Sequence, residues 1–212
     1  MSTPPARERA RRPGRSEVRA TLLAAATRVF ARRGIDAASV DDVAAAAGYT
    51  KGAVYSNFAS KDGLVAAIVE EQTAAYLELG LAAAASTDGP LSARARALGD
   101  RLDAASADER DWHLLFVELW QRAVRGDPAV EGFRRRRTAM RDAIAAAVRE
   151  HAEASGAELV VPAEHAAVAI MALANGMALE RLVAPDDAPD GLTGELLAGL
   201  AASFSRPAPG SR

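Results

Sequence analysis

Apolar residues recur at intervals of three and four along most of the chain, which is the spacing of one face of an α-helix. The first such stripe runs through Leu22, Ala26 and Phe30. No segment alternates apolar and polar residues as a strand would. The pattern predicts an all-α fold of about nine helices. We expect them at residues 16–33, 40–47, 51–57, from 61 to a loop at 86–90, 91–106, 108–125, 128–153, 163–183 and 192–204.

Two of these helices carry unusual patterns. Residues 108–125 are apolar on nearly all sides, which predicts a buried helix. Residues 163–183 are rich in small side chains that permit close helix approach. The segments 1–15 and 206–212 lack periodicity, so we expect both to be disordered.

Composition narrows the functional classes. Hydrophobic residues make up 50% of the chain and aromatic residues only 5%, which favours closely packed helices. There are no cysteines, so disulfides, thiolate metal sites and a cysteine nucleophile are excluded. No apolar run approaches the roughly 20 residues that span a bilayer. A soluble, intracellular protein is expected.

Charge is distributed unevenly. Residues 1–33 hold nine arginines against two glutamates, although the net charge of the whole chain is −2. A basic N-terminal segment followed by an acidic remainder of the chain suggests that this segment contacts a polyanion. A disordered, solubilising tail explains the same charge equally well.

The segment 39–58, SVDDVAAAAGYTKGAVYSNF, has the spacing of a helix-turn-helix. Ser39 and Thr50 are N-cap residues for its two helices. Ala44 is small where the first helix presses on the second, and Gly48 follows where the turn requires a left-handed backbone. Val54 then anchors the second helix in the core. These residues together, at these offsets, predict a helix that enters the major groove of DNA.

The outward residues of this segment suit a DNA surface, because they offer hydroxyls, an ammonium, an amide and small side chains. Lys61 opens the following helix, where exposed amides favour a phosphate. The alternative for Tyr55 is a packing role with a wet hydroxyl. The candidate DNA-binding residues are Ser39, Thr50, Lys51, Gly52, Ala53, Tyr55, Ser56, Asn57 and Lys61.

Residues 19–64 resemble the DNA-binding domain of the TetR family of bacterial transcriptional regulators. Tyr49 stands where valine is more usual, and Ser56-Asn57 fill positions more often held by an aromatic residue and histidine. The operator sequence therefore cannot be copied from a relative. The residues that carry the resemblance are Leu23, Ala25, Ala26, Phe30, Gly34, Ser39, Val40, Val43, Ala44, Ala47-Gly48-Tyr49-Thr50-Lys51-Gly52, Val54-Tyr55, Phe58, Lys61 and Leu64.

The resemblance implies a disordered basic arm (1–15), a DNA-binding domain (16–76) and an effector-binding and dimerisation domain (77–212). It implies a cytoplasmic homodimer that binds a palindromic operator in double-stranded DNA and leaves it when a small molecule binds. The last two helices would form a four-helix bundle with their partner copies. The expected interface residues are Ala169, Leu173, Gly176, Met177, Leu192, Leu196, Leu200 and Phe204.

Helices within 77–160 would enclose the effector cavity, and we expect the effector to be largely apolar. Core packing is the alternative role for each cavity candidate. Four successive residues wrap a helix, so at least one of the arginines 134–137 must lie against the body of the protein. We expect the run to be a solvated face whose stems lie along the surface, and the alternative is that one arginine pairs with an anionic effector. The candidate cavity residues are Trp112, His113, Phe116, Trp120, Phe133 and Met140.

Other functional classes fit the sequence less well. It has no glycine-rich phosphate loop, HExxH or GxSxG motif, so we expect no enzyme, no catalytic residues and no cofactor. Glu109 and His113 could share a helix face, but no further ligand completes a metal site. An activator or a DNA-binding accessory factor without an effector is the alternative function. A helical binding protein with a vestigial motif is a weaker one.

Overall fold

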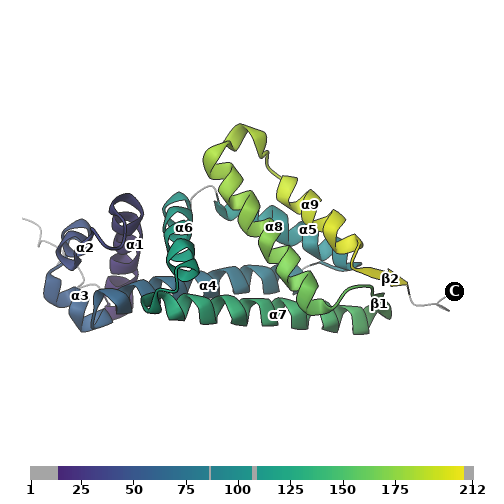
Figure 1. Ribbon diagram of the computed structural model, residues 1–212, viewed down its shortest axis with the longest axis horizontal. Helices are drawn as coiled ribbons and strands as arrows, with labels where there is room; N and C mark the ends of the chain where they lie inside the picture. The colour runs from purple at the N-terminus through teal and green to yellow at the C-terminus, as the bar shows by residue number, and fades with distance from the viewer. Residues whose placement is uncertain (1–13, 86, 107–108, 208–212) are drawn as a thin grey trace, which may run out of the picture.

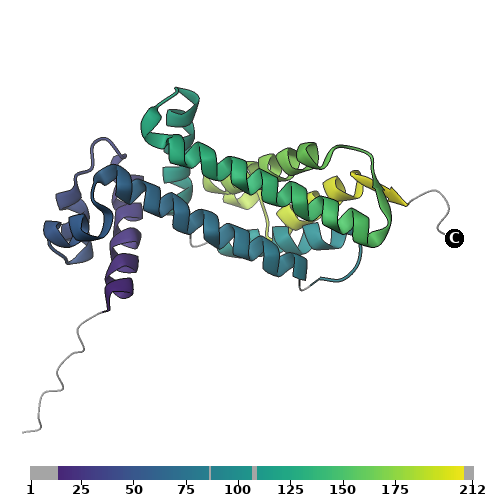
Figure 2. The same cartoon turned by 90° about the horizontal axis from the view of Figure 1, so that it is seen from below.

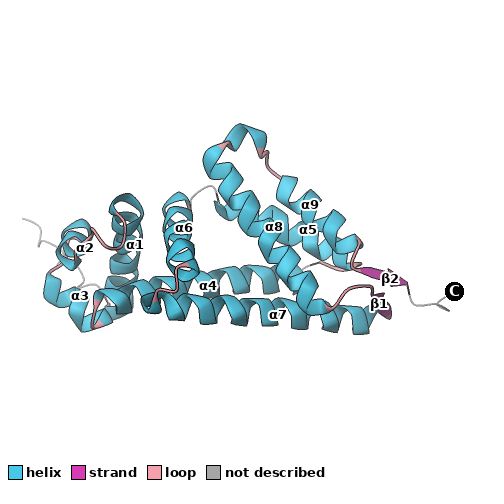
Figure 3. Cartoon of the chain, in the orientation of Figure 1, coloured by secondary structure: helices cyan, strands magenta, loops and turns pink. Residues whose placement is uncertain are grey.

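The computed structural model describes residues 14–85, 87–106 and 109–207. This part of the chain is helical apart from two very short strands, which confirms the all-α prediction (Figure 3). Single 3₁₀ turns precede α7 and follow α8. The elements are α1 (Arg15–Arg33), α2 (Val40–Ala47), α3 (Lys51–Phe58), α4 (Lys61–Ala85), α5 (Leu91–Ser106), α6 (Arg110–Val124), α7 (Glu131–Ser155), β1 (Ala157–Leu159), α8 (Ala163–Val183), α9 (Leu192–Ala202) and β2 (Ser205–Pro207).

Two long helices, α4 and α7, run side by side along the length of the molecule (Figures 1 and 2). Helix α1 and the short helices α2 and α3 gather at one end, around the beginning of α4. Helix α6 stands across the long pair, next to α1, and α5, α8 and α9 pack against the opposite end. The molecule therefore has a small N-terminal head and a larger helical body, joined through α4 and α6.

The buried residues form two cores. The domain boundary expected at residue 76 does not separate them, because the first core includes residues of α6 and α7. The first core joins the inner faces of α1–α4 to Leu115 and Leu119 of α6 and to Phe133 of α7. The second core joins α5, α7, α8 and α9, with Leu197 fully buried. Because α4 continues unbroken from Lys61 to Ala85, and α6 shares the core of the head, the two parts meet over packed helices rather than at a linker.

Most helix bounds agree with the sequence pattern, and α5 and α8 have the expected limits. Helix α1 starts at Arg15, one residue earlier than expected, and Gly14 occupies its N-cap position. Pro128 opens a 3₁₀ turn, and α7 begins only at Glu131. The antiparallel pair β1–β2 was not expected, because three-residue strands are too short to show alternation. The disorder expected for residues 1–15 and 206–212 is wrong at Arg15, which opens α1, and at residues 206–207, which pair with β1; residues 1–13 and 208–212 lie outside the described residues.

The expectation that α6 is buried on all sides is wrong. Trp112, Leu115 and Leu119 are buried, but Trp120 is 42% exposed and Val124 is 76% exposed. The inner stripe packs between α1 and α7, while the opposite side of the last two turns faces solvent. The sequence shows apolar residues all round this helix, but only the packing of its neighbours decides which of them are covered.

The body is held by a close crossing of α5 and α9. A Cβ atom on Gly99 would lie 2.4 Å from the backbone of Gly194, so only glycine allows the two helices to approach this closely. Asp103 of α5 accepts the backbone N–H groups of Gly191 (2.9 Å) and Thr193 (3.3 Å) at the start of α9. It also pairs with Arg181 of α8 at 2.5 Å. These buried contacts fix α8 and α9 relative to α5.

Helix α8 has the longest apolar stretch in the described part of the chain, of a kind that core helices of soluble proteins also show. By length and composition alone, residues 163–183 are long and apolar enough to cross a membrane. Only 28% of the relevant window is buried in the protomer, so much of this helix presents apolar surface. Val168 and Val183 are among its exposed side chains.

Candidate functional site

Side-chain caps define the two short helices of the head. The Ser39 hydroxyl accepts the backbone N–H of Asp42 at 3.1 Å, and the Asp42 carboxylate accepts the N–H of Ser39 at 2.8 Å. This reciprocal capping box starts α2. Gly48 then adopts φ 71° and ψ 27°, the left-handed conformation expected for the turn. The Thr50 hydroxyl accepts the N–H of Ala53 at 3.2 Å and so starts α3.

The helix-turn-helix predicted from the spacing is present. Val43 and Ala44 of α2 and Val54 of α3 are buried in the core of the head. The Tyr49 N–H donates to the Ala44 carbonyl at 2.9 Å across the turn. Because the buried residues fix its rotation, α3 must direct its remaining side chains away from the core.

These outward side chains match the DNA-binding candidates. Tyr55 is 46% exposed, which argues against the alternative of a packing role. Lys51 pairs with Asp41 at 2.7 Å on the surface, and this hydrogen bond raises the pKa of the lysine. Ser56 and Asn57 both donate to the Ala53 carbonyl, at 2.9 Å and 2.8 Å. Ser39, Thr50 and Gly52 are exposed and Ala53 is half-buried.

Lys61 has partners that the sequence did not suggest. Its ammonium donates to the backbone carbonyls of Ala38 (2.8 Å) and Asp36 (3.2 Å), in the loop between α1 and α2. The lysine therefore ties the start of α4 to this loop. A phosphate contact remains a prediction that these bonds neither require nor exclude, since an ammonium carries three donors.

Helix α6 also binds the loop between α1 and α2, from the other side. The Glu118 carboxylate accepts the Ile35 N–H, with its two oxygens at 2.9 Å and 3.1 Å. Arg122 lies 3.2 Å from the Asp36 carboxylate and bonds Asp127 at 2.6 Å. We call these contacts of Glu118 and Arg122 with the loop the clamp. The sequence did not indicate it, because its partners are far apart along the chain.

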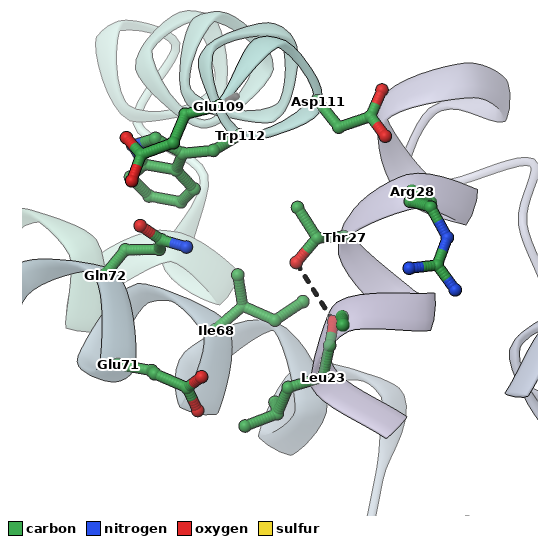
Figure 4. A pocket seen from close by; sticks show the side chains of 10 residues that line it. Leu23, Thr27, Arg28, Ile68, Glu71, Gln72, Glu109, Asp111 and Trp112 are labelled. Atoms are coloured by element: carbon green, nitrogen blue, oxygen red, sulfur yellow. Dashed lines mark hydrogen bonds between the residues drawn. The ribbon is translucent and has the colours of Figure 1, made fainter. Parts of the chain in front are cut away.

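A cleft of about 290 Å³ separates the head from the body, between α1, α4 and α6 (Figure 4). Leu23 and Thr27 of α1 face Ile68 of α4 across it, and Trp112 of α6 closes one side. Polar side chains such as Gln72 and Arg28 stand at its rim. Leu23, Ile68 and Trp112 also belong to the core that joins the head to α6 and α7, so a change of angle at this cleft would have to repack that core.

A larger cavity of about 540 Å³, partly open to solvent, lies in the body between α4, α5, α6, α7, α8 and Leu197 of α9. Five of the six candidate residues line it: Trp112, His113, Phe116, Phe133 and Met140. Trp120 does not, because it lies on the outer side of α6. The remaining walls are mainly apolar. They include Leu77, Leu91, Leu98, Leu102, Ile144, Val148, Ile170 and Leu197.

Polar groups meet between the cleft and the cavity. The Tyr76 hydroxyl, on α4, donates to the Glu109 carboxylate, and the ring Nδ1 of His113 lies 3.0 Å from the Glu109 carbonyl oxygen. Burial raises the pKa of Tyr76 and lowers the pKa of His113. The Glu109–His113 pair is thus occupied in hydrogen bonding, and the described residues contain no group of three side chains suited to a metal ion.

The residues expected at the dimer interface form two groups, one at least partly exposed and one buried. Leu196 is 41% exposed and Gly176 is exposed with no side-chain atom near it. Ala169, Leu173, Leu192 and Leu200 are half-buried. Met177 and Phe204 are instead buried within the protomer, so their packing partners come from the same chain.

Comparison with known proteins identifies the head. Residues 22–68 match the family model for bacterial regulatory proteins of the tetR family. The HTH-type transcriptional repressor Rv3405c of Mycobacterium tuberculosis is 45% identical over 71 residues. This segment is 33% of the present chain and 38% of that protein, so the likeness spans well under half of the relative.

The fold likeness extends over nearly the whole chain. A proposed transcriptional regulator from Pseudomonas aeruginosa PAO1 is 23% identical, with a TM-score of 0.76 over 90% of this chain and 91% of its own. A proposed TetR-family regulator from Rhodococcus sp. is 27% identical, with a TM-score of 0.68 over 89% and 98%. With the helix-turn-helix geometry, these findings lead to one conclusion: residues 22–68 form a DNA-binding domain of the tetR family of bacterial regulatory proteins, and the fold of the whole chain is similar to that of solved regulators, one of them a proposed TetR-family member.

Proposed function

We propose that this protein is a ligand-released repressor, which binds a palindromic operator as a cytoplasmic homodimer. In this proposal α3 of each protomer enters the major groove, with Thr50, Lys51, Tyr55, Ser56 and Asn57 reading base edges. A small molecule in the body cavity changes the separation of the two α3 helices and lowers operator affinity.

The observation that carries the proposal is the position of α6. His113 and Phe116 on this helix line the cavity, while Glu118, in its third turn, holds the loop that precedes α2. A ligand that displaces α6 must therefore move the clamp on the head, or strain it. The cleft between α1, α4 and α6 borders the core that this motion would repack.

The apolar surfaces of α8 and α9 support a homodimer. Three apolar side chains are exposed here: Val168 and Val183 of α8 and Leu196 of α9. Burying them against a partner would lower the free energy. Gly176 provides a flat site for close approach by a partner helix. Two copies of α8 and α9 would form the four-helix bundle that the family resemblance implies.

The cavity also supports a regulator with an effector over the alternative of an activator or accessory factor without one. A DNA-binding module with no ligand has no need for a hollow of about 540 Å³ in its body. Packed interiors rarely leave such space without a function. The name of the M. tuberculosis relative, a repressor, is consistent with the direction of regulation proposed here.

The test is a footprint of the purified full chain on the intergenic DNA beside its own gene. We expect one protected inverted repeat, with two protomers bound per site by sedimentation, and reduced transcription from that promoter in a reconstituted assay. Increased transcription would reverse the sign of the regulation. Protection without any inverted repeat would contradict the dimeric operator.

A further inference from the structure

The four consecutive arginines at the start of α7 differ in their partners. Arg134 bonds Glu131 (2.9 Å) and the carbonyl of Ala123 (2.8 Å), and Arg136 pairs with Glu70 at 2.5 Å. Arg135 is exposed and lies 3.9 Å from Glu131. Arg137 has no carboxylate within ion-pair distance among the described residues, and its guanidinium makes no hydrogen bond there.

Arg137 is instead surrounded by aromatic rings. Its guanidinium carbon lies 4.2 Å from the ring centre of Trp120, 5.5 Å from that of Phe116 and 5.9 Å from that of Phe133. Burial, helped by the nearby cation of Arg141, lowers the pKa of Arg137 to about 10. The group remains a cation at neutral pH, but one with no carboxylate partner in the part of the chain that the structure describes. Stacking leaves the N–H groups at the edge of the guanidinium plane available to a ligand.

Arg137 lines the body cavity, whose other walls are mostly apolar. The other titratable groups on those walls are Arg94, Arg136, His113, His151, Tyr76 and Glu150. Arg136 is already paired, and Arg94 carries a buried Nε atom without a partner. Cationic side chains therefore outnumber the single carboxylate, Glu150, and an acid entering the cavity would meet a favourable potential.

We propose that the effector is an apolar molecule with one anionic group, a carboxylate or a sulfonate-like acid, and that Arg137 binds this group. The inference rests on the proposed effector function of the cavity and adds the chemistry of the ligand. A bidentate bond from Arg137 positions the anion beside Phe116 and Phe133, and the apolar part extends between Leu98, Leu102 and Val148. The anion thus lies next to α6, the helix that holds the head.

The test uses two fluorescent probes that differ in charge, on the full chain without DNA. 1-Anilinonaphthalene-8-sulfonate carries a sulfonate, and N-phenyl-1-naphthylamine has the same rings without it. We expect the native protein to bind the sulfonate more tightly. Arg137→Met should weaken sulfonate binding by roughly 10-fold or more, since charge-assisted bonds to a half-buried arginine are lost, and should change binding of the neutral probe less than about twofold.

Two further variants keep the test sharp. Arg137→Lys retains a charge without the planar fork, so it should restore part of the preference for the sulfonate and covers the case in which the methionine variant does not fold. Arg135→Gln removes an exposed neighbouring charge and should leave both affinities unchanged. Circular dichroism and thermal unfolding check that each variant is native.

Three outcomes would overturn the proposal. Equal affinity of the native protein for both probes would exclude an anionic subsite, while leaving the cavity as an effector site. Loss of the sulfonate preference in Arg94→Met but not in Arg137→Met would place the anion at Arg94. Failure of both probes to bind would count against the effector function itself, together with the inference that depends on it.

Discussion

Removing the Glu118 carboxylate tests whether α6 holds the head of the molecule. In the native protein both of its oxygens lie within 3.1 Å of the Ile35 nitrogen. Gly34, which precedes this amide, has φ 81° and ends α1. The substitution Glu118→Ala therefore leaves a backbone N–H at the end of a helix without its acceptor.

The magnitude follows from the kind of bond and its burial. A hydrogen bond to a charged group contributes roughly 1.5–3 kcal/mol. Ile35 is buried, but the carboxylate is half-exposed and part of its interaction is screened by water, so the lower end applies. We expect a loss of about 1.5 kcal/mol. With a urea dependence of about 2 kcal/mol per M, the unfolding midpoint falls by roughly 0.7 M.

The assay is urea unfolding followed by circular dichroism at one fixed protein concentration, because the stability of a dimer depends on concentration. Glu118→Gln keeps one carbonyl oxygen as acceptor and should lose less than the alanine variant. Glu153→Ala removes an exposed carboxylate on α7 and serves as the control. A midpoint for Glu118→Ala equal to that of the control would refute the clamp between α6 and the head.

Four further changes test other parts of the account. Tyr55→Ala should cost about 1–3 kcal/mol of preference for operator over random DNA in competition binding, because an exposed reader of base edges is lost; an equal loss on both duplexes would show that it does not read sequence. Lys61→Met should reduce the salt slope of DNA binding by about one, and an unchanged slope would limit this lysine to its loop carbonyls. Leu196→Asp should give monomers in sedimentation, whereas Val124→Asp, exposed on α6, should leave the dimer intact; a surviving Leu196→Asp dimer would place the interface elsewhere. Burial lowers the pKa of His113 in the folded protein. Below the ordinary value of 6.5 the unfolded chain therefore binds more protons than the folded one, and the free energy of unfolding should rise with pH over that window. His113→Gln should flatten this rise between pH 5.5 and 7.5, and an equally steep rise in the variant would contradict it.

Local chemistry made much of the head predictable from the chain alone. The caps at Ser39 and Thr50 and the left-handed Gly48 act over three or four residues, and all three take the expected conformation. Val54 is buried because the helical period places it opposite the exposed side of α3. Short-range signals of this kind also gave the limits of α5 and α8. The strands β1 and β2 were not predicted, because their pairing joins segments that are distant in the sequence.

What the sequence determined by itself was the set of helices, the turn between α2 and α3 and the family resemblance, because caps, glycines and helical periodicity act within a few neighbours. Tertiary structure alone decided the partners of those side chains. It brought Glu118 to an amide 83 residues away and Lys61 to a carbonyl 23 residues away. It also distinguished Arg137 from three identical neighbours. Four successive residues point in four directions around a helix, and only the packing of α6 and α7 determines which of them faces aromatic rings and a cavity instead of a carboxylate.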